Sequence, residues 1–413
     1  MPKHMRKIAV LGGGIAGVTT ALELVKNDAN RVTLFESKAH ILEGTSARTP
    51  GRMGLGFHYL ADLDSASQYL HSTVGFARQF PGFILGRGQS HLTRGRYFLV
   101  DDPSQSHGLS LPKIMSVIQA LQSVYAALCE HDPANQLFGP PDKFFRVLKQ
   151  DQFSDRINSD KVILGIETCE ALLDWFKFSN HLKQLVYHAQ NLSTFTNTPV
   201  ETVHSIGDFG FYINGEQFDQ VVNCTWENME SIAALAKLTS PNTASLRIKL
   251  LAEVHLPATL LDMHSSFFCV GPYAMFSNMG EGVGRITYAP VTNYFHTQEA
   301  ALPQEMASLV TQCAQTPAIE HAGRQIIDGV AQFIPAMRHA SLKKVYPGIV
   351  RTYGTNMDIY DPQSDIHRRR ERGIEQLSPH WVNNGAMKLF HALVNARDAA
   401  VLLRADAVHK EII

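Results

Sequence analysis

The chain has 413 residues, of which 45% are hydrophobic and 18% are charged, as in a globular protein large enough for two domains. Its 37 basic and 38 acidic side chains give a formal net charge of −1, so no global field favours nucleic acid or an anionic membrane. The run at 368–370 is three arginines, which we interpret as a solvated loop because nucleic-acid binders usually show a broader basic surface.

The five cysteines are scattered and form no C-x-x-C, so neither a zinc ribbon nor a redox dithiol is indicated. Reduced thiols fit a cytoplasmic protein. The basic N-terminus precedes only four apolar residues, which is no signal peptide, and no apolar stretch approaches the roughly twenty residues of a membrane span. We therefore expect a cytoplasmic protein without a membrane span, a metal site or a nucleic-acid partner.

Residues 8–36 begin with the pattern of a dinucleotide-binding βαβ unit. The first four residues are apolar and predict a buried strand, and Gly12, Gly14 and Gly17 form G-x-G-x-x-G where this strand must end. Apolar residues then recur at helical spacing. A strand, a glycine turn and a helix in this order predict a site for the ADP half of a dinucleotide.

A second strand over 32–35 ends on Glu36, which is placed to accept hydrogen bonds from a ribose diol and to repel a 2′-phosphate. Each glycine has a separate reason. Gly12 permits the tight turn, Gly14 lets the backbone approach the pyrophosphate, and Gly17 allows close packing of helix and strand. The N–H groups at the helix N-terminus would then face the phosphates.

The rest of the chain mixes strands and helices without an internal repeat. In the first half of the chain we expect hairpin strands over 85–105, with a clear strand at 96–100, and helices over 112–129 and 172–191. A strand at 198–203, a hairpin at 209–215 and a strand at 220–224 follow. We then expect several strands within 245–292, a helix over 299–316, a strand or turn at 347–352 and a closing helix over 386–403. The fold class is therefore α/β, with a discontinuous Rossmann-like domain and a second, sheet-rich α+β domain.

Four segments resemble the FAD-dependent oxidoreductases of the D-amino-acid oxidase family, which includes glycine and sarcosine oxidases, L-2-hydroxyglutarate dehydrogenase and glycerol-3-phosphate dehydrogenase. The first is the glycine fingerprint with Glu36. The second, 47–59, resembles the loop of the hydroxy-acid branch that runs beneath the flavin. The third, 220–226, is similar to the family strand "vVnAtGxw". The fourth comprises 346–352, similar to "yaGiRp", and 384–389, similar to the "nGGKlT" turn beside the flavin ring.

The resemblance implies FAD as the cofactor, in an FAD-binding domain over 1–80, 150–240 and 335–413, with a substrate domain over 81–149 and 241–334. It also implies the cofactor-binding residues: Gly12, Gly14, Ile15, Ala16, Gly17, Glu36, Ser37, Arg48, Met53, Gly54, Val200, Thr225, Trp226, Gly385, Ala386, Met387 and Lys388.

The chain departs from the family pattern at several positions near the flavin. Gly54 stands where some relatives carry a histidine that attaches flavin, and no cysteine lies near 345–350, so we expect non-covalent FAD. The glycine after Thr225 and the second glycine of the turn at 384–389 are missing. These substitutions indicate a divergent substrate site or a distant branch.

Three side chains are candidates for catalysis. Arg351 either clamps a substrate carboxylate or forms a structural salt bridge. His58 either takes a proton from the substrate amine or hydroxyl or is structural, and Tyr59 either anchors the substrate or packs.

Positive charge is also expected near the N1–C2=O edge of the flavin. The backbone N–H groups of Ala386 and Met387, at a helix N-terminus, could supply it together with Lys388. Lys388 could equally be an exposed surface residue.

The sequence thus predicts an oxidoreductase that oxidises a small amine or amino acid at the carbon bearing nitrogen, by hydride transfer to FAD, with oxygen or another acceptor. An FAD-dependent 2-hydroxy-acid dehydrogenase or oxidase is the alternative. An alternative of another class is a non-catalytic dinucleotide-binding protein.

Overall fold

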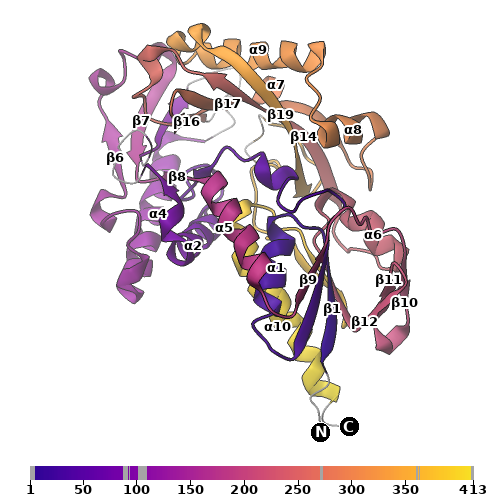
Figure 1. Cartoon of the computed structure of the whole chain (residues 1–413). Coiled ribbons are helices and arrows are strands. Elements are labelled where there is room, and N and C mark those ends of the chain that lie inside the picture. The colour runs from indigo at the N-terminus through magenta and orange to yellow at the C-terminus, as the bar shows by residue number, and fades with distance from the viewer. Residues whose placement is uncertain are drawn as a thin grey trace.

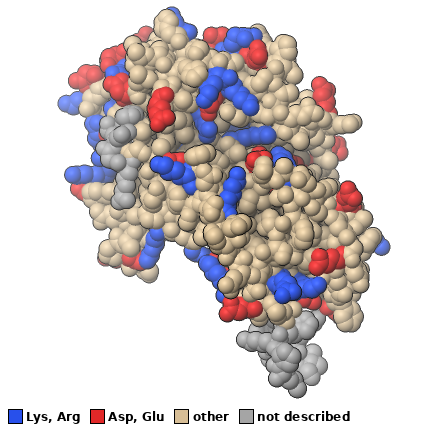
Figure 2. All heavy atoms as spheres, viewed as in Figure 1, with Lys and Arg blue, Asp and Glu red and all other residues tan. Residues whose placement is uncertain are grey.

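A computed structural model describes residues 5–86, 92, 94–100, 109–269, 273–359, 361 and 363–410, with side chains up to residue 404. Two large sheets organise it, one in the lower and one in the upper half of Figure 1. Figure 2 shows Lys and Arg interspersed with Asp and Glu on the viewed face, in keeping with a formal net charge near zero.

The lower sheet has six strands, which are parallel except for an antiparallel pair at one edge. Its central strand pairs Ala9 with Val221 on one side and with Thr33 on the other. The spatial order is β20 (Ile374–Ser378), β21 (Trp381–Asn384), β13 (Gln220–Asn223), β1 (Arg6–Leu11), β2 (Asn30–Phe35) and β9 (Leu192–Phe195).

Helices cover the lower sheet in Figure 1: α1 (Ile15–Leu24), α5 (Trp175–His188) and α10 (Ala392–Lys410). Both α5 and α10 contact α1, so nearly all of α1 is buried although its sequence is not uniformly apolar. On the same sheet, a hairpin sheet of β10 (Val203–Ser205), β11 (Phe211–Ile213) and β12 (Glu216–Phe218) packs through aromatic rings beside α6 (Met229–Leu235).

The upper sheet has nine strands and is mostly antiparallel. Its spatial order is β18 (Asn293–Thr297), β14 (Ala244–His255), β17 (Val283–Tyr288), β16 (Ala274–Gly280), β15 (Ser266–Cys269), β5 (Arg96–Val100), β7 (Val162–Thr168) and β6 (Phe145–Leu148), with β19 (Ser341–Tyr353) paired along β14.

The two faces of β14 pack against different layers. Ile248 and Leu250 belong to a core shared with α9 (Pro317–Ala331), near α7 (Ala289–Thr292) and α8 (Gln304–Gln312). Because side chains alternate along a strand, Arg247 and Lys249 project from the opposite face. Leu251 lies on that face too, and it belongs to the core of the lower half of the molecule. This face of β14 is therefore directed toward the lower sheet.

Between the two large sheets lie α2 (Leu63–Gln79), α4 (Leu111–His131) and a small sheet of β3 (Arg52–Met53), β8 (Ala171–Leu173) and β4 (Ile84–Leu85). Helices α2 and α4 pack on each other. None of the helices within the described ranges combines the length and the apolar character that crossing a bilayer requires.

Most expected elements are confirmed, and four boundaries are corrected. The helix expected over 299–316 spans only Gln304–Gln312, because Cys313 adopts a left-handed conformation that ends it. The helix expected over 172–191 begins at Trp175, because the residues before it pair as β8 and Asp174 caps the helix. The strand expected at 198–203 is mostly irregular, since Pro199 lacks an N–H and its carbonyl accepts from Asn214. The closing helix begins only at Ala392.

Two further expectations concern segment limits. The hairpin expected over 85–105 includes 87–91, 93 and 101–105, which lie outside the described residues, while its strand at 96–100 is β5. The division into domains stays a prediction. The expected limits put β7 and β19 in the FAD-binding domain. Because both strands belong to the upper sheet, we propose that they are part of the substrate domain.

Candidate functional site

A cavity of about 550 Å³ lies at the carboxyl ends of β1, β2 and β13. The carboxyl edge of a parallel sheet is where α/β folds bind ligands. The cavity also reaches β19 and the turn that follows β21. Its lining is Gly12, Gly14, Ile15, Ala16, Phe35–Lys38, Gly44–Ser46, Arg48–Pro50, Thr198–Val200, Cys224–Asn228, Ser231, Ile232, Ile349, Val350 and Gly385–Leu389.

The three fingerprint glycines have different steric surroundings. Gly12 has φ +96°, and a Cβ there would lie 2.7 Å from the Cys224 carbonyl oxygen. A Cβ on Gly17 would lie 1.8 Å from the Gly12 oxygen, so helix and strand could not pack. A Cβ on Gly14 would have only the Ser46 hydroxyl nearby, at 3.4 Å, and Gly14 lines the cavity. Gly14 therefore leaves room for a ligand and not for protein packing.

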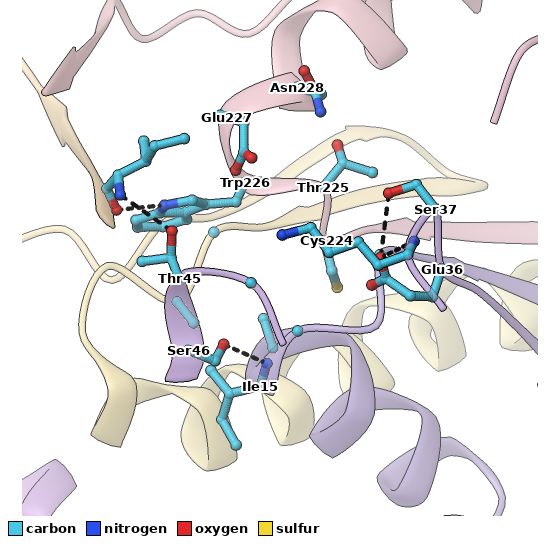
Figure 3. Close-up of a pocket in the computed structure, with 18 of the residues that line it drawn as sticks. Ile15, Glu36, Ser37, Thr45, Ser46, Cys224, Thr225, Trp226, Glu227 and Asn228 are labelled. Atoms are coloured by element: carbon cyan, nitrogen blue, oxygen red, sulfur yellow. Dashed lines mark hydrogen bonds between the residues drawn. The ribbon is translucent and has the colours of Figure 1, made fainter. Parts of the chain in front are cut away.

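Glu36 fastens the glycine turn and lines the cavity. Its Oε2 accepts a hydrogen bond from the Gly13 N–H at 2.7 Å. Its Oε1 accepts from the Lys38 N–H at 2.8 Å and from the Ser37 hydroxyl at 3.2 Å (Figure 3). The carboxylate is thus held at the end of β2, where a ribose diol could add its own hydrogen bonds.

Ser46 is a residue that the sequence analysis missed. Its hydroxyl accepts a hydrogen bond from the Ile15 N–H at 3.0 Å, at the N-terminus of α1 (Figure 3). This is the place where a phosphate would be bound by a helix N-terminus. Neighbouring Thr45 accepts from the Ile349 N–H at 3.2 Å. Only their position in the loop after β2 could have pointed to these residues.

Two departures from the family pattern keep a glycine-like backbone. Trp226 stands where the family has a glycine and has φ +54°, and its indole N–H donates to the Ile349 carbonyl at 2.9 Å. Ala386 stands at the missing second glycine and has φ +39°. Both lie in the left-handed region, where residues with a Cβ are strained. The chain therefore preserves the turn geometry although the glycines are gone.

The structure brings most of the expected cofactor residues together. Gly17, Met53 and Gly54 do not line the cavity; Gly17 acts through packing. The expected residues that do line it are Gly12, Gly14, Ile15, Ala16, Glu36, Ser37, Arg48, Val200, Thr225, Trp226, Gly385, Ala386, Met387 and Lys388. Their roles toward a cofactor stay predictions.

The expected charge at a backbone helix N-terminus is corrected. Helix α10 starts at Ala392, well after the turn. The Ala386 N–H donates to the Asn384 side chain at 3.2 Å, and the Met387 N–H donates to the Arg372 carbonyl at 3.1 Å. Both N–H groups are therefore occupied, and Lys388 is the one basic side chain within Gly385–Leu389.

Arg351 does not line the cavity. It is fully buried, its guanidinium forms an ion pair with Glu230, and it lies 4.7 Å from the ring centre of Tyr353. Of the two interpretations open for Arg351, this geometry favours the structural salt bridge over the substrate clamp.

A buried carboxylate holds the loop at 47–59. Glu170 is 2% exposed and accepts hydrogen bonds from Arg52 at 2.7 Å, from the Leu55 N–H at 2.6 Å and from the Tyr97 hydroxyl at 2.8 Å. A side chain on Gly54 would collide with Tyr69, at 2.7 Å from the added Cβ. The loop is therefore fixed to the upper sheet, and no larger residue fits at position 54 without movement.

His58 and Tyr59 follow in this loop and lie beside Lys388. The His58 ring is 4.7 Å from the Phe267 ring, and the Lys388 Nζ is 5.3 Å from the Tyr59 ring centre. Burial, then the charge of Lys388, lowers the pKa of His58 well below its ordinary value. Burial raises the pKa of Tyr59 to about 12. Both side chains are thus neutral near pH 7, and the same burial and positive charges oppose protonation of His58.

Further basic side chains lie near His58, Tyr59 and Lys388. Arg247 and Lys249 project from β14, and Arg369 is only 5% exposed. The interpretation of the arginine run as a solvated loop is therefore wrong for Arg369. Burial, with the charges of Arg247 and Arg369, lowers the pKa of Lys249 to about 7. We call Arg247, Lys249, Arg369 and Lys388 the cation cluster. Within the described residues, no group of three or more His, Cys, Asp or Glu is arranged to hold a metal ion.

Comparisons with known proteins identify relatives of this chain in family and in fold. A family model described as FAD dependent oxidoreductase (DAO) matches residues 7–249. Glycine oxidase from Geobacillus kaustophilus has a TM-score of 0.64 at 13% identity, covering 97% of this chain and 95% of its own. L-α-Glycerophosphate oxidase from Mycoplasma pneumoniae, with FAD bound, has a TM-score of 0.63 at 16% identity, covering 97% and 95%. These likenesses show a shared fold.

A sequence relative matches over a shorter stretch. The FAD-dependent monooxygenase kojA of Aspergillus flavus is 28% identical over 99 residues, which are 24% of this chain and 23% of that protein. The match therefore spans less than a quarter of that relative's length.

Replacing Gly14 should remove the cofactor without unfolding the protein. Gly14→Val should keep the melting temperature of the cofactor-free protein, because the added side chain meets only Ser46, yet it should show no bound flavin absorbance. Gly75→Ala is the matched control, since nothing lies within 4 Å of an added Cβ on α2. Full flavin occupancy in Gly14→Val would contradict the assignment of this turn.

Replacing Ala386 by glycine should relieve backbone strain. We expect Ala386→Gly to be neutral or to stabilise by up to about 1 kcal/mol, measured by urea unfolding, because the left-handed conformation strains alanine. Ala307→Gly, within α8, should instead destabilise by about 1 kcal/mol. Equal destabilisation by both changes would contradict strain at Ala386.

Neutralising Lys249 should stabilise the protein in a pH-dependent way. Its pKa is about 7 in the folded protein, so charging it opposes folding most strongly below pH 7, and this cost declines up to the ordinary lysine pKa. In a zwitterionic buffer, Lys249→Gln should raise the melting temperature by a few degrees at pH 6 and by less at pH 9. Arg247, Arg369, Lys388, His58 and His367 also face this group. An increase that grows with pH would contradict the lowered pKa.

Proposed function

This chain belongs to the family of FAD-dependent oxidoreductases, and from this premise we propose that it oxidises a small amine or amino acid at the carbon that bears nitrogen. FAD, when bound, supplies the acceptor for a hydride. The chain itself binds the cofactor, orients the substrate and holds or moves the proton. Oxygen or another acceptor would then take the electrons.

One observation carries this proposal. A single cavity joins the glycine fingerprint with the turn at Gly385–Leu389, and Lys388 of that turn lies against Tyr59. The residues fit FAD, because Gly14 leaves the helix N-terminus open to phosphates and Glu36 is fixed at the ribose position. The far end of the cavity then lies beside the loop that carries His58.

The neighbouring side chains have matching roles in the proposal. His58 is neutral near pH 7 and accepts the proton that leaves the substrate nitrogen. Tyr59 keeps its hydroxyl proton, and this buried hydroxyl lies next to the guanidinium of Arg369, from where it can orient the substrate. Lys388 provides positive charge where negative charge develops on the ring's N1–C2=O edge.

The names of similar structures support an amino acid as substrate. They include glycine oxidase, L-proline dehydrogenase from P. horikoshii, with a TM-score of 0.65 at 15% identity, and L-amino acid deaminase from Proteus vulgaris. A 2-hydroxy acid is the second candidate, because the loop at 47–59 resembles that branch. The proposal includes non-covalent FAD, since Gly54 replaces the attaching histidine, and a cytoplasmic location, since the cysteines are free.

The first test is the absorbance spectrum of the purified protein before and after acid precipitation. We expect the bands of oxidised flavin, which should move entirely to the supernatant because the link is non-covalent. Anaerobic mixing with amines, amino acids and 2-hydroxy acids should then bleach the bound flavin with members of one class. Bound flavin that no compound bleaches would overturn the proposed function, and colour left in the pellet would overturn the non-covalent link.

A further inference from the structure

The cation cluster contains four basic side chains and no acid. Arg247 and Lys249 come from β14, Arg369 from the segment before β20, and Lys388 from the turn after β21. The charges of Arg369, Lys249 and Arg247 all lower the pKa of Lys388, after burial itself. Within the described residues, no Asp or Glu forms an ion pair with any of the four. Among the described residues, the guanidinium charges of Arg247 and Arg369 are therefore uncompensated, and the pKa values of Lys249 and Lys388 are lowered beside them.

Two of these cations are buried and have a guanidinium N–H group without a hydrogen-bond partner among the described residues. Arg247 is 5% exposed and donates to Asn293 at 3.1 Å, while its Nε has no partner. Arg369 is 5% exposed and donates to the Arg351 carbonyl at 3.1 Å and to the Thr352 hydroxyl at 2.7 Å, while its Nε also has no partner. Buried charges are usually paired, because an unpaired one costs several kcal/mol in stability. A ligand that pairs with them would remove this cost.

The cluster adjoins the cavity described above. Lys388 lines that cavity, and its Nζ lies 5.3 Å from the Tyr59 ring and 5.9 Å from the Tyr69 ring. Lys249 and Lys388 stay partly exposed, although burial dominates the electrostatics of both. Lys388 is therefore the member of the cluster that a ligand in this cavity would meet. Such a ligand would lie near Tyr59 and His58.

A single carboxylate would neutralise only one of these charges. We propose that the substrate carries at least two negative charges, as a phosphate ester or a dicarboxylate does, and that Arg247, Lys249, Arg369 and Lys388 bind them. This inference rests on the proposed function, because it places the anion beside the reacting end of the cofactor. Arginine forks match planar carboxylates and phosphates, while the two lysines act as point charges.

The test uses the FAD-loaded protein and needs no turnover. Sulfate and malonate are the dianionic probes, and methanesulfonate and acetate are their monoanionic counterparts, at pH 6.5 and constant ionic strength. Binding is followed by the shift of the bound flavin spectrum and by the melting temperature. We expect each dianion to bind at least about tenfold more tightly than its monoanion. Tighter binding of sulfate indicates a phosphate ester, and tighter binding of malonate indicates a dicarboxylate.

Variants tie the effect to the cluster. Lys249→Gln should weaken dianion binding by about tenfold, whereas Lys249→Arg, which keeps the charge, should retain most of it. The matched control is Lys113→Gln, which changes an exposed lysine at the start of α4 and should leave binding unchanged. Both Lys249 variants should keep full flavin absorbance, which shows that they fold.

Three results separate the possible failures. Dianions that bind no more tightly than monoanions, or equal binding to wild type and Lys249→Gln, would overturn the dianionic substrate even if amino acids bleach the flavin. Preferential dianion binding that Lys249→Gln weakens would support it even if no tested compound bleaches the flavin. In that second case the proposed oxidation, and not the anion site, would be wrong.

Discussion

The close contact between β1 and α1 is the constraint on which the site depends. Gly17 has no room for a Cβ against the Gly12 carbonyl, so the helix can approach the strand only because both residues are glycines. That approach aims the N-terminus of α1 into the cavity, where Gly14 leaves it uncovered. The Glu36 carboxylate then fastens the turn from the neighbouring strand. A local steric condition in six residues thus sets the position of the proposed cofactor site.

The sequence predicted the backbone geometry of this turn, because its signals are local. A glycine pattern, an apolar strand and an acid at the end of the next strand specify the backbone by short-range sterics. The fold class and the family could be predicted for the same reason. Trp226 and Ala386 show the limit of that approach: their residue types argued against a glycine-like turn, yet tertiary contacts hold both in the left-handed region.

The substrate side could not be predicted, because its residues meet only through the tertiary fold. Nothing in the sequence around Arg247 or Lys249 indicates that they face Arg369, which lies more than a hundred residues away in an arginine run that looked solvated. Conversely, Arg351 stood in a family-like motif, but the fold supplies Glu230 as its partner. Charge placement on a strand face depends on which layer covers the other face, and that information is not local.

The long strand β19 gives the cavity wall another consequence. Among the described residues it pairs with β14 alone, so its other side is a sheet edge thirteen residues long, of the kind that invites pairing with another molecule. On this edge, the Ile349 N–H donates to the Thr45 hydroxyl, and the Ile349 carbonyl accepts from the Trp226 indole. The Pro347 carbonyl accepts from Arg48. The same side chains line the cavity. Residues that line the cavity therefore also cover part of this edge against edge-to-edge pairing, which links solubility to the integrity of the cavity wall.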